Sequence, residues 1–450
     1  MPCMTAHEAS KLLGISTDTI RRWEKKGLIK ASRDARNYRV FDSDEITRLQ
    51  NKVCGSHDLS INNYKILRTD TPSAYKCIEL FAGAGGTALG MENAGLQHIL
   101  LNEFDKDAAQ TLRQNFPSSN VVEGDVHGLD FSGYEGKADV VQAGFPCQAF
   151  SYAGNRKGFE EARGTLFFEF ARCVKETRPK IAVGENVRGL LKHDGGRTLA
   201  TMVEVFNELG YRVMYRVLRS QYLDVPQKRE RLIILAIRDD LDIPFVFPKE
   251  KDYTISMREA LFKCPPSDGQ KYPPKKHAVM ELVPEGGYWK DLPVEIQKSY
   301  MGASFFLSGG KTGMARRLSW DEPSLTLTCA PAQKQTERCH PTETRPLTVR
   351  EYARIQTFPD SWKFAGSMAS QYKQIGNAVP VNLGYHVGRC VIAMLTGKYA
   401  SDMDVVWPEK GKSDKHRQGT LTDEIAAEDA RQKEAAVAKS GKRRTKAKAD

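Results

Sequence analysis

Short apolar runs alternate with longer segments of helical period through the middle of the chain. The apolar runs have the length and composition of buried strands: CIELFAG, HILLNEF, NVVEGDV, ADVVQAG, KIAVGENV, RVMYRVLRS and RLIILAIRD. The segments between them carry the period of helices: GTALGMENAG, KDAAQTLRQNF, TLFFEFARCVKETRP and GRTLATMVEVFNELG. This alternation predicts an α/β fold, with a mostly parallel sheet covered on both faces. Ligands of such sheets bind at the carboxyl ends of the strands.

The segments on either side follow other patterns. Residues 4–50 predict helix, short turn and helix, then a basic hairpin in RDARNYRVF and a third helix that begins in DSDEITRL. Residues 53–74 are polar and without period, which favours a linker. Residues 240–344 are rich in Pro, Gly and short apolar pieces, and we expect a second small domain of irregular or β structure. Helices return in TVREYARIQTF and VPVNLGYHVGRCVIAMLTG, and residues 408–450 form a charged tail that we expect to be mostly mobile.

Composition narrows the class of partner. The chain has 450 residues and a net charge of +11, which suits a polyanion, nucleic acid first. Its nine cysteines are never spaced as C-x-x-C, which argues against a disulfide framework and against a zinc site. No apolar run approaches the ~20 residues of a membrane helix, and no signal peptide is evident. We therefore expect a cytoplasmic protein with reduced thiols, no bound metal and no membrane partner.

Three successive predicted strands end in residues that suit a nucleoside. In ELFAGAGG, the glycines that let the backbone approach a ligand are Gly83, Gly85 and Gly86. The next strand ends in Glu103, which can accept both ribose hydroxyls, and the third ends in Asp125, which can bind an adenine amine. Phe81 and Phe104 can hold the base between apolar faces. No G-x-x-x-x-G-K-[ST] loop is present, so a nucleoside cofactor is favoured over ATP hydrolysis.

A cysteine follows the fourth of these strands. The stretch DVVQAGFPCQAFS brings Cys147 to the start of a loop, a position that a nucleophile needs and a buried structural thiol does not. Glu185 and Asn186 follow the next apolar run, and Arg229 and Arg231 alternate in QKRER so that both face one side. A thiol, a carboxylic acid and two cations would supply a nucleophile, a proton donor and a lowered thiol pKa.

These motifs together resemble the DNA (cytosine-5) methyltransferases. In chain order they are ELFAGAGG, NEFD, GDV, GFPCQAFS, ENVRG, QKRER, RPLTVREYARIQTFPDSW and GNAVP, from about residue 76 to 398. Glu79 stands where that family more often has aspartate, and we expect it to serve as a carboxylate near the cofactor. The first 52 residues resemble a MerR-type winged helix-turn-helix, through their helix pair, tryptophan, GLIK, basic wing and YRVF.

The resemblance implies a domain plan. A Rossmann-like mixed sheet of the S-adenosylmethionine-dependent methyltransferases would span residues 75–239 and 345–400, with a target-recognition domain at 240–344. An all-α winged helix-turn-helix at residues 1–52 would precede the linker. The implied cofactor, S-adenosylmethionine, would contact Phe81, Ala82, Gly83, Gly85, Gly86, Glu103, Phe104, Asp125, Val126, Pro146, Asn377 and Ala378.

The family also implies roles at the reacting base. Cys147 would attack C6 of a cytosine flipped out of the duplex, Glu185 would bond to N3, and Arg231 would contact O2, with Arg229 beside it. Asn186 would hold the loop. Attack at C6 makes C5 nucleophilic enough to take the methyl group, after which a base removes the C5 proton and the cysteine leaves.

Further residues are implied to contact DNA. Ser151 and Arg163 belong to a segment expected to close over the duplex, with Ser151 on a phosphate. The target-recognition segment contains types that read base edges or touch phosphate: Arg316, Arg317, Gln333, Lys334, Gln335 and Arg338. In the winged unit the implied contacts are Thr17, Thr19, Arg21 and Arg22 from the helix, and Arg33, Arg36, Tyr38 and Arg39 from the wing.

Three functions remain open at this point. The first is a modification methylase that protects DNA from a restriction endonuclease acting on the same site, with possible autoregulation through the winged unit. The second is a transcription regulator without catalysis, and the third is a transfer RNA cytosine-5 methyltransferase. No long dimerisation helix is evident between residues 52 and 74, so we expect a monomer.

Overall fold

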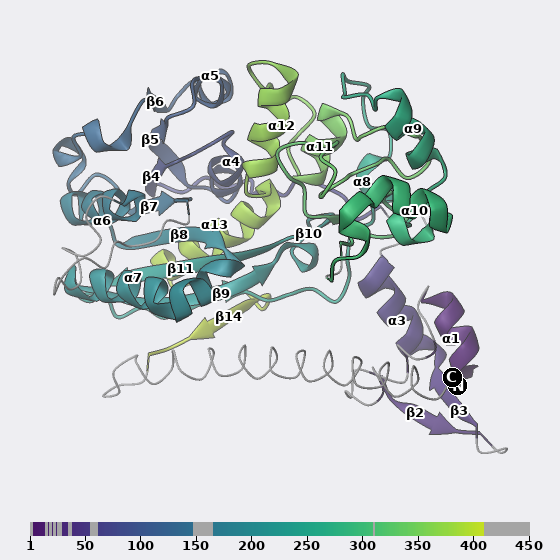
Figure 1. Ribbon diagram of the computed structural model, residues 1–450. Coiled ribbons are helices and arrows are strands. Elements are labelled where there is room, and N and C mark those ends of the chain that lie inside the picture. Colours follow the sequence, from purple (N-terminus) through teal and green to yellow (C-terminus); the bar gives the residue numbers. More distant parts are fainter. Residues whose placement is uncertain are drawn as a thin grey trace.

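A seven-stranded sheet forms the centre of the computed structural model, which describes residues 3–13, 17, 20, 24, 29–34, 38–54, 62–146, 165–308 and 311–408 (Figure 1). The strand order is β6-β5-β4-β7-β8-β11-β9. The strands are β4 (Lys76–Leu80), β5 (Gln97–Glu103), β6 (Asn120–Glu123), β7 (Val140–Ala143), β8 (Ile181–Val187), β9 (Tyr211–Arg219) and β11 (Glu230–Arg238). The pairs among β4 to β8 are parallel, whereas β11 is antiparallel to β8 and β9. The predicted mixed α/β sheet is confirmed.

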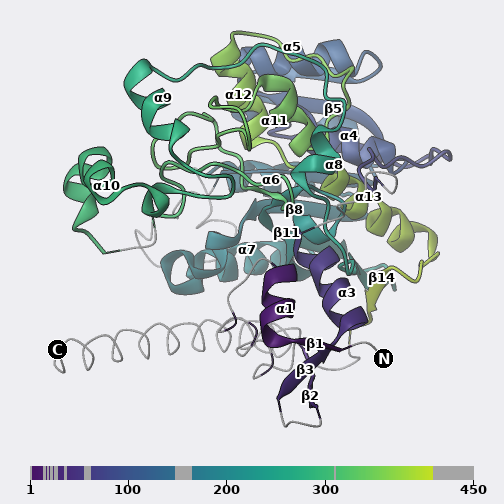
Figure 2. The ribbon, with the colours of Figure 1, turned by 90° about the vertical axis from the view of Figure 1, so that its right-hand side faces the viewer.

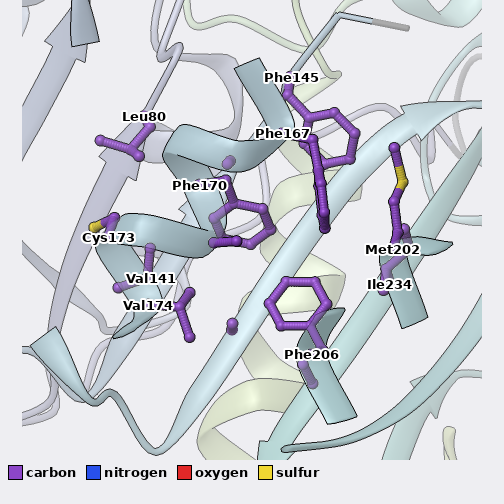
Figure 3. Close-up of a cluster of buried hydrophobic side chains, with 14 of the residues drawn as sticks. Leu80, Val141, Phe145, Phe167, Phe170, Cys173, Val174, Met202, Phe206 and Ile234 are labelled. Carbon is purple, nitrogen blue, oxygen red and sulfur yellow. The ribbon is translucent and has the colours of Figure 1, made fainter. Parts of the chain in front are cut away.

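Helices cover both faces of the sheet. One face packs against α6 (Leu166–Thr177) and α7 (Arg197–Glu208), and the other against α4 (Gly86–Asn93) and α13 (Val381–Thr396). Phe145, Phe167, Phe170 and Phe206 meet in the first of these layers, with neighbouring ring centroids 5.4 to 6.3 Å apart (Figure 3). Neighbouring strand residues face opposite layers, as Ile78 and Cys77 do, so burial on both sides explains the continuous apolar runs.

The winged unit contains a small sheet as well as helices. The predicted hairpin is confirmed, since β2 (Ala31–Arg33) pairs antiparallel with β3 (Arg39–Asp42). The expectation of an all-α unit is wrong, because β1 (Cys3–Thr5) adds a third strand beside β3. Two further elements are α1 (Ala6–Leu12), which begins with a Thr5–Glu8 capping box, and α3 (Ser43–Cys54). These elements are purple in Figures 1 and 2.

Residues 62–73, expected to be part of a linker, are bound along the large domain. We call this segment the strap. The Tyr64 hydroxyl donates to the carbonyl of Arg354 (2.9 Å), and the Leu67 amide donates to Asn382 Oδ1 (2.9 Å). The strap ends where the Ser73 amide donates to Gly95 O (2.8 Å). The prediction of a linker is therefore wrong for this part of the chain, which packs along the large domain.

Asn382 joins the strap to a buried polar cluster, which we call the hub. Its Nδ2 donates to Lys65 O (2.9 Å) and to Asp224 O (2.7 Å). The Asp224 carboxylate accepts from the Tyr253 hydroxyl (2.5 Å), from Lys251 Nζ (2.6 Å) and from His386 Nε2 (2.8 Å). These bonds lower the pKa of Asp224 well below its usual range despite its burial.

The small domain is built of short helices around its own apolar cluster. They are α9 (Pro274–Glu281), η7 (Trp289–Asp291), α10 (Val294–Met301) and η8 (Gly302–Phe305), seen on the left of Figure 2. Of the expected irregular or β structure, the described part of this domain contains β13 (Ser324–Leu325), which pairs with β10 (Gln227–Lys228), and isolated bridges that Cys339 forms with Arg317 and Pro346. The predicted start at residue 240 is too early: β12 (Phe245–Pro248) pairs with β14 (Met403–Val406), and α8 (Met257–Leu261) packs on the large domain.

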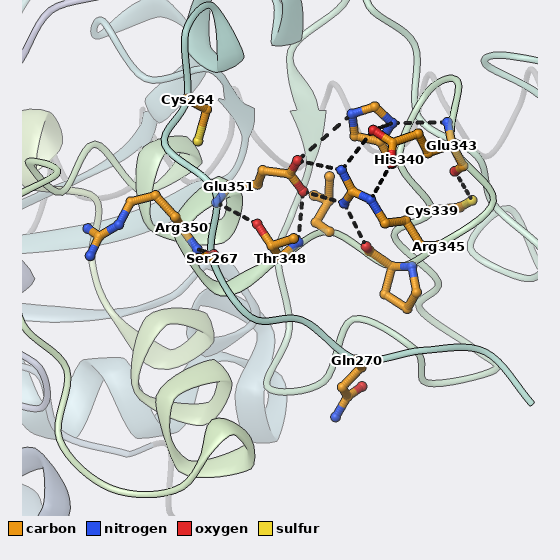
Figure 4. A network of polar contacts seen from close by, with 12 residues as sticks. Cys264, Ser267, Gln270, Cys339, His340, Glu343, Arg345, Thr348, Arg350 and Glu351 are labelled. Atoms are coloured by element: carbon orange, nitrogen blue, oxygen red, sulfur yellow. Dashed lines mark hydrogen bonds and ion pairs between the residues drawn. The ribbon is translucent and has the colours of Figure 1, made fainter.

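A network of charged residues joins the small domain to α11 (Val349–Ile355). The Arg345 guanidinium pairs with Glu351 through two bonds of 2.8 Å and also with Glu343 (Figure 4). The segment that leads from there to α12 (Met368–Asn377) contacts the end of α5 (Lys106–Asn115). Among the described residues, one helical stretch, Met368–Thr396, is long and apolar enough to cross a membrane, but 78% of its most apolar window is buried within the protein.

Candidate active site

A cavity of about 1060 Å³ opens at the carboxyl ends of β4, β5, β7 and β8. The small domain contributes a wall at residues 326–329, and the end of α12 closes another side. Among the predicted site residues, those that line it are Phe81, Ala82, Gly83, Gly86, Glu103, Phe104, Pro146, Glu185, Asn186, Arg229, Arg231, Asn377 and Ala378.

The turn after β4 holds the cavity rim in shape. Gly83 has a φ of +55°, and a Cβ built on it would meet no atom within 4 Å, so the backbone here faces open space. Glu103 holds this turn: its Oε2 accepts from the Gly83 amide (2.7 Å) and its Oε1 from the Asp105 amide (2.8 Å). The strand-end carboxylate thus lies at the rim beside the glycine turn.

The GNAVP segment closes on the same turn. A Cβ on Gly86 would lie 2.1 Å from the Val379 carbonyl oxygen, so glycine allows the two backbones to touch. Arg229 fixes the position of this segment, because its Nη1 and Nη2 each donate to Gly376 O at 3.2 Å. The last helices therefore bring Asn377 and Ala378 back to the first strand turn, although they lie almost 300 residues later in the sequence.

Glu185 and Arg231 form an ion pair at the inner end of the cavity. Arg231 Nε lies 2.7 Å from Glu185 Oε1, and both side chains are largely buried. Antiparallel pairing of β8 with β11 sets this contact, since Val187 lies opposite Arg231. Burial raises the pKa of Glu185, and Arg231 and Arg229 only partly oppose this effect. A carboxyl group that keeps its proton more readily suits a hydrogen-bond donor to a ring nitrogen.

Asn186 fixes the approach to the predicted nucleophile. Its Nδ2 donates to the Phe145 carbonyl at 2.8 Å, and its own oxygen accepts from the Val187 amide at 2.8 Å. The strand end that leads to Pro146 is thereby tied to the strand that carries Glu185. Cys147 itself lies outside the described residues, as do Ser151 and Arg163.

The cavity contains buried polar atoms that meet no protein partner among the described residues. Gln142 Oε1 and Arg229 Nε are both of this kind, and both residues line the cavity. Buried polar atoms are normally hydrogen-bonded, so unpaired atoms on residues that line the cavity favour a polar ligand there. Together with the open glycine turn and the rim carboxylate of Glu103, they fit a ligand such as S-adenosylmethionine.

Glu79 lines the cavity but also has a partner behind it. Its Oε2 lies 3.2 Å from His98 Nε2, and His98 Nδ1 lies 3.3 Å from Glu92 Oε1. Burial raises the pKa of Glu79. Burial alone would lower the pKa of His98, but the Cys77 thiol and then the carboxyl groups of Glu79 and Glu92 raise it well above its ordinary value. Glu79 is thus a cavity carboxyl held by a buried histidine, consistent with its expected place near the cofactor.

Some predicted cofactor residues do not line the cavity, while others were missed. Gly85, Asp125 and Val126 are not among the lining residues, and Asp125 Oδ1 accepts from the amide of His127 and lies 2.6 Å from its Nδ1. Gln142 was missed, although an amide inside the apolar run VVQAG is a signal that the sequence offered. Thr326 and Thr328 were also missed, because loops distant in sequence carry no period that would place them here.

The predicted DNA-reading residues divide into two groups. The prediction that Arg317 reads DNA is wrong. Its side chain is buried, and its guanidinium donates to four carbonyl oxygens and to Thr344 Oγ1. It therefore holds the small domain together and has no donor left to read a base. Arg338 is also buried, with both Nε and Nη2 on Thr326 O. The structure does not test the DNA contacts predicted for Gln333, Lys334 and Gln335, and these stay predictions.

The winged-unit predictions are only partly described. Thr17 is half-buried, and Arg39 lies 3.3 Å from Glu24 while keeping 44% of its side chain exposed. Thr19, Arg21, Arg22 and Arg36 fall outside the described residues, as do residues 409–450 of the tail predicted at 408–450.

Comparisons with known proteins cover both units. The sequence model described as C-5 cytosine-specific DNA methylase matches residues 75–393, and that of the MerR family regulatory proteins matches residues 5–41. The chain is 54% identical over 404 residues to the type II methyltransferase M.Eco47II of Escherichia coli (86% of this chain, 95% of that protein). It is 56% identical over 332 residues to M.PspPI of Psychrobacter sp. (strain TA137), covering 72% of this chain and 80% of the relative.

Two solved structures share the fold. One is a putative DNA modification methyltransferase encoded within a prophage (E. coli), with a TM-score of 0.53 and 22% identity over 72% of this chain and 100% of that chain. The other is a mutant of Spodoptera frugiperda DNMT2, with a TM-score of 0.53 and 17% identity over 71% of this chain and 100% of the other.

Proposed function

The chain belongs to the C-5 cytosine-specific DNA methylases, and on that premise we propose that it methylates a flipped-out cytosine through a covalent bond from Cys147. It is a DNA (cytosine-5) methyltransferase that uses S-adenosylmethionine and acts on double-stranded DNA. The winged unit belongs to the MerR-type helix-turn-helix domains.

The proposed reaction uses the residues around the inner cavity in order. The Cys147 thiolate forms a bond to C6 of the cytosine, while Glu185 donates to N3 and so stabilises the charge that develops on the ring. S-adenosylmethionine, when bound, supplies the methyl group that C5 then takes. A base removes the C5 proton, the electron pair returns to the ring, and the bond between C6 and Sγ breaks.

The Glu185–Arg231 pair is the observation that carries this proposal. The 2.7 Å contact holds the carboxyl group in place, and burial raises its pKa, so a donor faces the cavity beside the strand that leads to Cys147. One Nη1 donor of Arg231 binds Glu230 O, and its remaining guanidinium donors suit a carbonyl oxygen such as cytosine O2. Asn186, through its bond to Phe145 O, keeps these two strand ends at a fixed separation.

The biological setting follows the relatives. Their names as type II methyltransferases support a modification enzyme that protects DNA from a restriction endonuclease acting at the same site without direct contact. The winged unit supports a second role, in which the enzyme binds an operator and limits its own expression. We propose a monomer as the active form.

The test is whole-genome bisulfite sequencing of a methylation-free host that expresses the chain or its Cys147→Ala form. One short motif should become methylated with the intact chain and remain unmethylated with the variant. Absence of any methylated DNA motif with well-expressed protein would contradict the proposal, and RNA from the same cells would then be tested for 5-methylcytosine. Motif methylation by Cys147→Ala would contradict the covalent step alone.

A further inference from the structure

A row of three ionisable side chains runs from the protein surface to the cavity wall. Glu92 on α4 has 33% of its side chain exposed, His98 on β5 is fully buried, and Glu79 on β4 is buried and lines the cavity. His98 Nδ1 lies 3.3 Å from Glu92 Oε1, and His98 Nε2 lies 3.2 Å from Glu79 Oε2. The reaction proposed above uses none of the three.

The pairing of β4 with β5 places His98 behind the cavity wall. His98 lies opposite Cys77 in this parallel pair, and the register of the two strands shifts directly after Cys77. Irregularities of this kind re-aim side chains and are common beside active sites. The ring therefore has a carboxyl group at each nitrogen, one from β4 and one from α4.

Contacts at both ring nitrogens favour the charged form of His98. A neutral imidazole has one N–H and can donate to one acceptor, whereas an imidazolium donates from both nitrogens. Glu79 Oε2 and His98 Nε2 have no other partner in the described part of the chain. Burial opposes a charge on His98, but the Cys77 thiol and the carboxyl groups of Glu79 and Glu92 raise its pKa well above the ordinary value. We therefore expect an imidazolium behind the cavity wall at neutral pH.

This imidazolium influences the charge of Glu79. Burial raises the pKa of Glu79, the carboxyl groups of Glu92 and Glu185 add to this rise, and His98 opposes it. Without His98, the Glu79 carboxyl group would keep its proton to a higher pH. The cavity wall would then present a neutral group over a wider range of pH.

Glu79 lies between the two ends that the cofactor has to join. Glu103 and Phe104, at the end of β5, suit the adenosine end, and Glu185, on β8, is the group proposed to bind the cytosine. Between β5 and β8 the sheet contains β4 and β7, where Glu79 and Gln142 are paired in register. The methionine part of S-adenosylmethionine carries two positive groups, the sulfonium and the ammonium. A negative charge on this part of the wall complements either of them.

We propose that His98 is a positioning residue for the cofactor: as an imidazolium held by Glu92, it keeps the Glu79 carboxylate ionised toward a positive group of S-adenosylmethionine. The inference rests on the use of that cofactor in the proposed function and adds to it a residue that does not touch the ligand. Glu79 is ionised above its pKa, so this part of the cofactor affinity is complete above that pH and is lost as pH falls through it.

The experiment measures dissociation constants by isothermal titration calorimetry from about pH 5.5 to about pH 9, on the full chain without DNA. The forms are wild type, His98→Phe, Glu79→Gln and the double variant of these two. Three ligands are compared: S-adenosylmethionine carries both positive groups, S-adenosylhomocysteine only the ammonium, and 5′-methylthioadenosine neither. His386→Phe is the matched control, because His386 is also buried and its Nε2 also faces a carboxylate, that of Asp224 in the hub, at 2.8 Å.

His98→Phe should raise the pH at which cofactor affinity falls by about one to three units, because a cation that favours the ionised Glu79 is removed. Near pH 7 its dissociation constant should be about ten- to a hundred-fold that of wild type, the range for a lost bond between charged groups. Glu79→Gln should abolish this pH dependence, and adding His98→Phe to it should change affinity little. The amino group of the ligand titrates near pH 8 and affects every form alike, so Glu79→Gln supplies the baseline.

The control and the ligands refine this outcome. His386→Phe should lower the midpoint of thermal unfolding and keep the wild-type pH dependence of cofactor affinity. A dependence shared by S-adenosylmethionine and S-adenosylhomocysteine assigns the contact to the ammonium, and one confined to S-adenosylmethionine assigns it to the sulfonium. Should His98→Phe not fold, His98→Gln replaces it, since the amide keeps a donor without the charge and should shift the pH dependence in the same direction.

Three results would overturn the proposal. The first is an unshifted pH dependence in a folded His98 variant, and the second is an additive loss of affinity in the double variant. The third is an equal pH dependence for 5′-methylthioadenosine, which would show that Glu79 does not act on a positive group. Any of these, with S-adenosylmethionine still bound by wild type, would leave the proposed function intact, whereas no binding to wild type at any pH would contradict both.

Discussion

Two buried polar clusters in this enzyme are built from neighbouring stretches of chain and end up with opposite characters. Along the chain, Asp224 of the hub lies five residues before Arg229 of the inner cavity. Asn377 of the cavity likewise lies five residues before Asn382 of the hub. In the hub, both Asp224 oxygens and both polar atoms of the Asn382 amide have protein partners. In the cavity, Gln142 Oε1 and Arg229 Nε have none among the described residues.

Polar groups with protein partners stabilise the fold, whereas polar groups without them are suited to bind a ligand. A fully bonded buried cluster loses stability when one member is removed, because its partners are left uncompensated. An open polar atom contributes little to stability and much to binding. Substitutions in the hub should therefore change the free energy of unfolding, whereas substitutions in the cavity should change the rate or the KM.

The largest effect is expected on the rate, from Glu185→Ala. Loss of the donor to N3 should lower the single-turnover methylation rate by about 10²–10⁴-fold, the range of general acid catalysis. Because burial raises the pKa of Glu185, the wild-type rate should fall as pH rises through that raised pKa and the group loses its proton. Methyl transfer from tritiated cofactor to the mapped duplex measures both.

Glu185→Gln is the matched control for this change. It keeps an N–H donor that does not titrate, so it should retain more activity than the alanine form and lack the loss of rate on the alkaline side. An unchanged alkaline limb in Glu185→Gln would assign that titration to another group that must be protonated for the reaction.

The next effect is expected on stability, from Asp224→Ala in the hub. Removing a buried carboxylate that binds Lys251, Tyr253 and His386 should lower the free energy of unfolding by about 3 kcal/mol, measured by urea denaturation. The pKa of Asp224 is depressed in the folded state, so its stabilisation is complete above its unfolded pKa of about 4 and is lost as pH falls below that value.

The acid side of the stability curve provides the check. Wild type should lose stability more steeply than Asp224→Ala between about pH 4 and pH 2, so the two curves should converge there. Parallel curves, or an alanine form as stable as wild type at pH 7, would show that the hub carries no net stabilisation.

The smallest effects come from two glutamines given the same change. Gln356 is fully bonded: its Oε1 accepts from Gln227 Nε2 (2.8 Å), and its Nε2 donates to Ile375 O (2.6 Å) and Ala378 O (3.0 Å). Gln356→Leu should therefore cost about 1–3 kcal/mol of stability. Gln142→Leu removes an open acceptor, so stability should change by less than about 0.5 kcal/mol, while the KM for S-adenosylmethionine rises about five- to tenfold.

Denaturation and initial-rate kinetics on both leucine variants measure this contrast. If Gln142→Leu destabilises the protein as much as Gln356→Leu and leaves the KM unchanged, the open oxygen is a structural group and the comparison between hub and cavity fails at that position.

The sequence predicts the sheet and most of the cavity because each rests on local patterns. Burial on both faces requires continuous apolar strands, and the chemistry resides in the residues that follow them, such as Glu103 and Glu185. Helix α12 escaped this reasoning, since MASQYKQIGN has little apolar content to show a period.

The features that the sequence does not predict depend on long-range contacts. Strand β12 is completed by β14 more than 150 residues later, which moved the small-domain boundary. Arg317 belongs to a residue type that reads DNA, and only the structure shows its guanidinium buried among carbonyls. The strap is polar and extended, and its partners, such as Arg354, lie almost 300 residues away.

The strap also limits how far the winged unit can travel. Asn62 is bound to Glu259, so the covalent path from Cys54, the last residue of α3, to the strap has eight residue steps, where a linker over the whole predicted range would have roughly twenty. At 3.3–3.6 Å per residue the two attachment points are never more than about 28 Å apart, less than one turn of B-form DNA. Under the proposed operator role, a duplex held by the catalytic unit is at high effective concentration for the winged unit, and we therefore expect operator binding and methylation to be coupled on one DNA molecule.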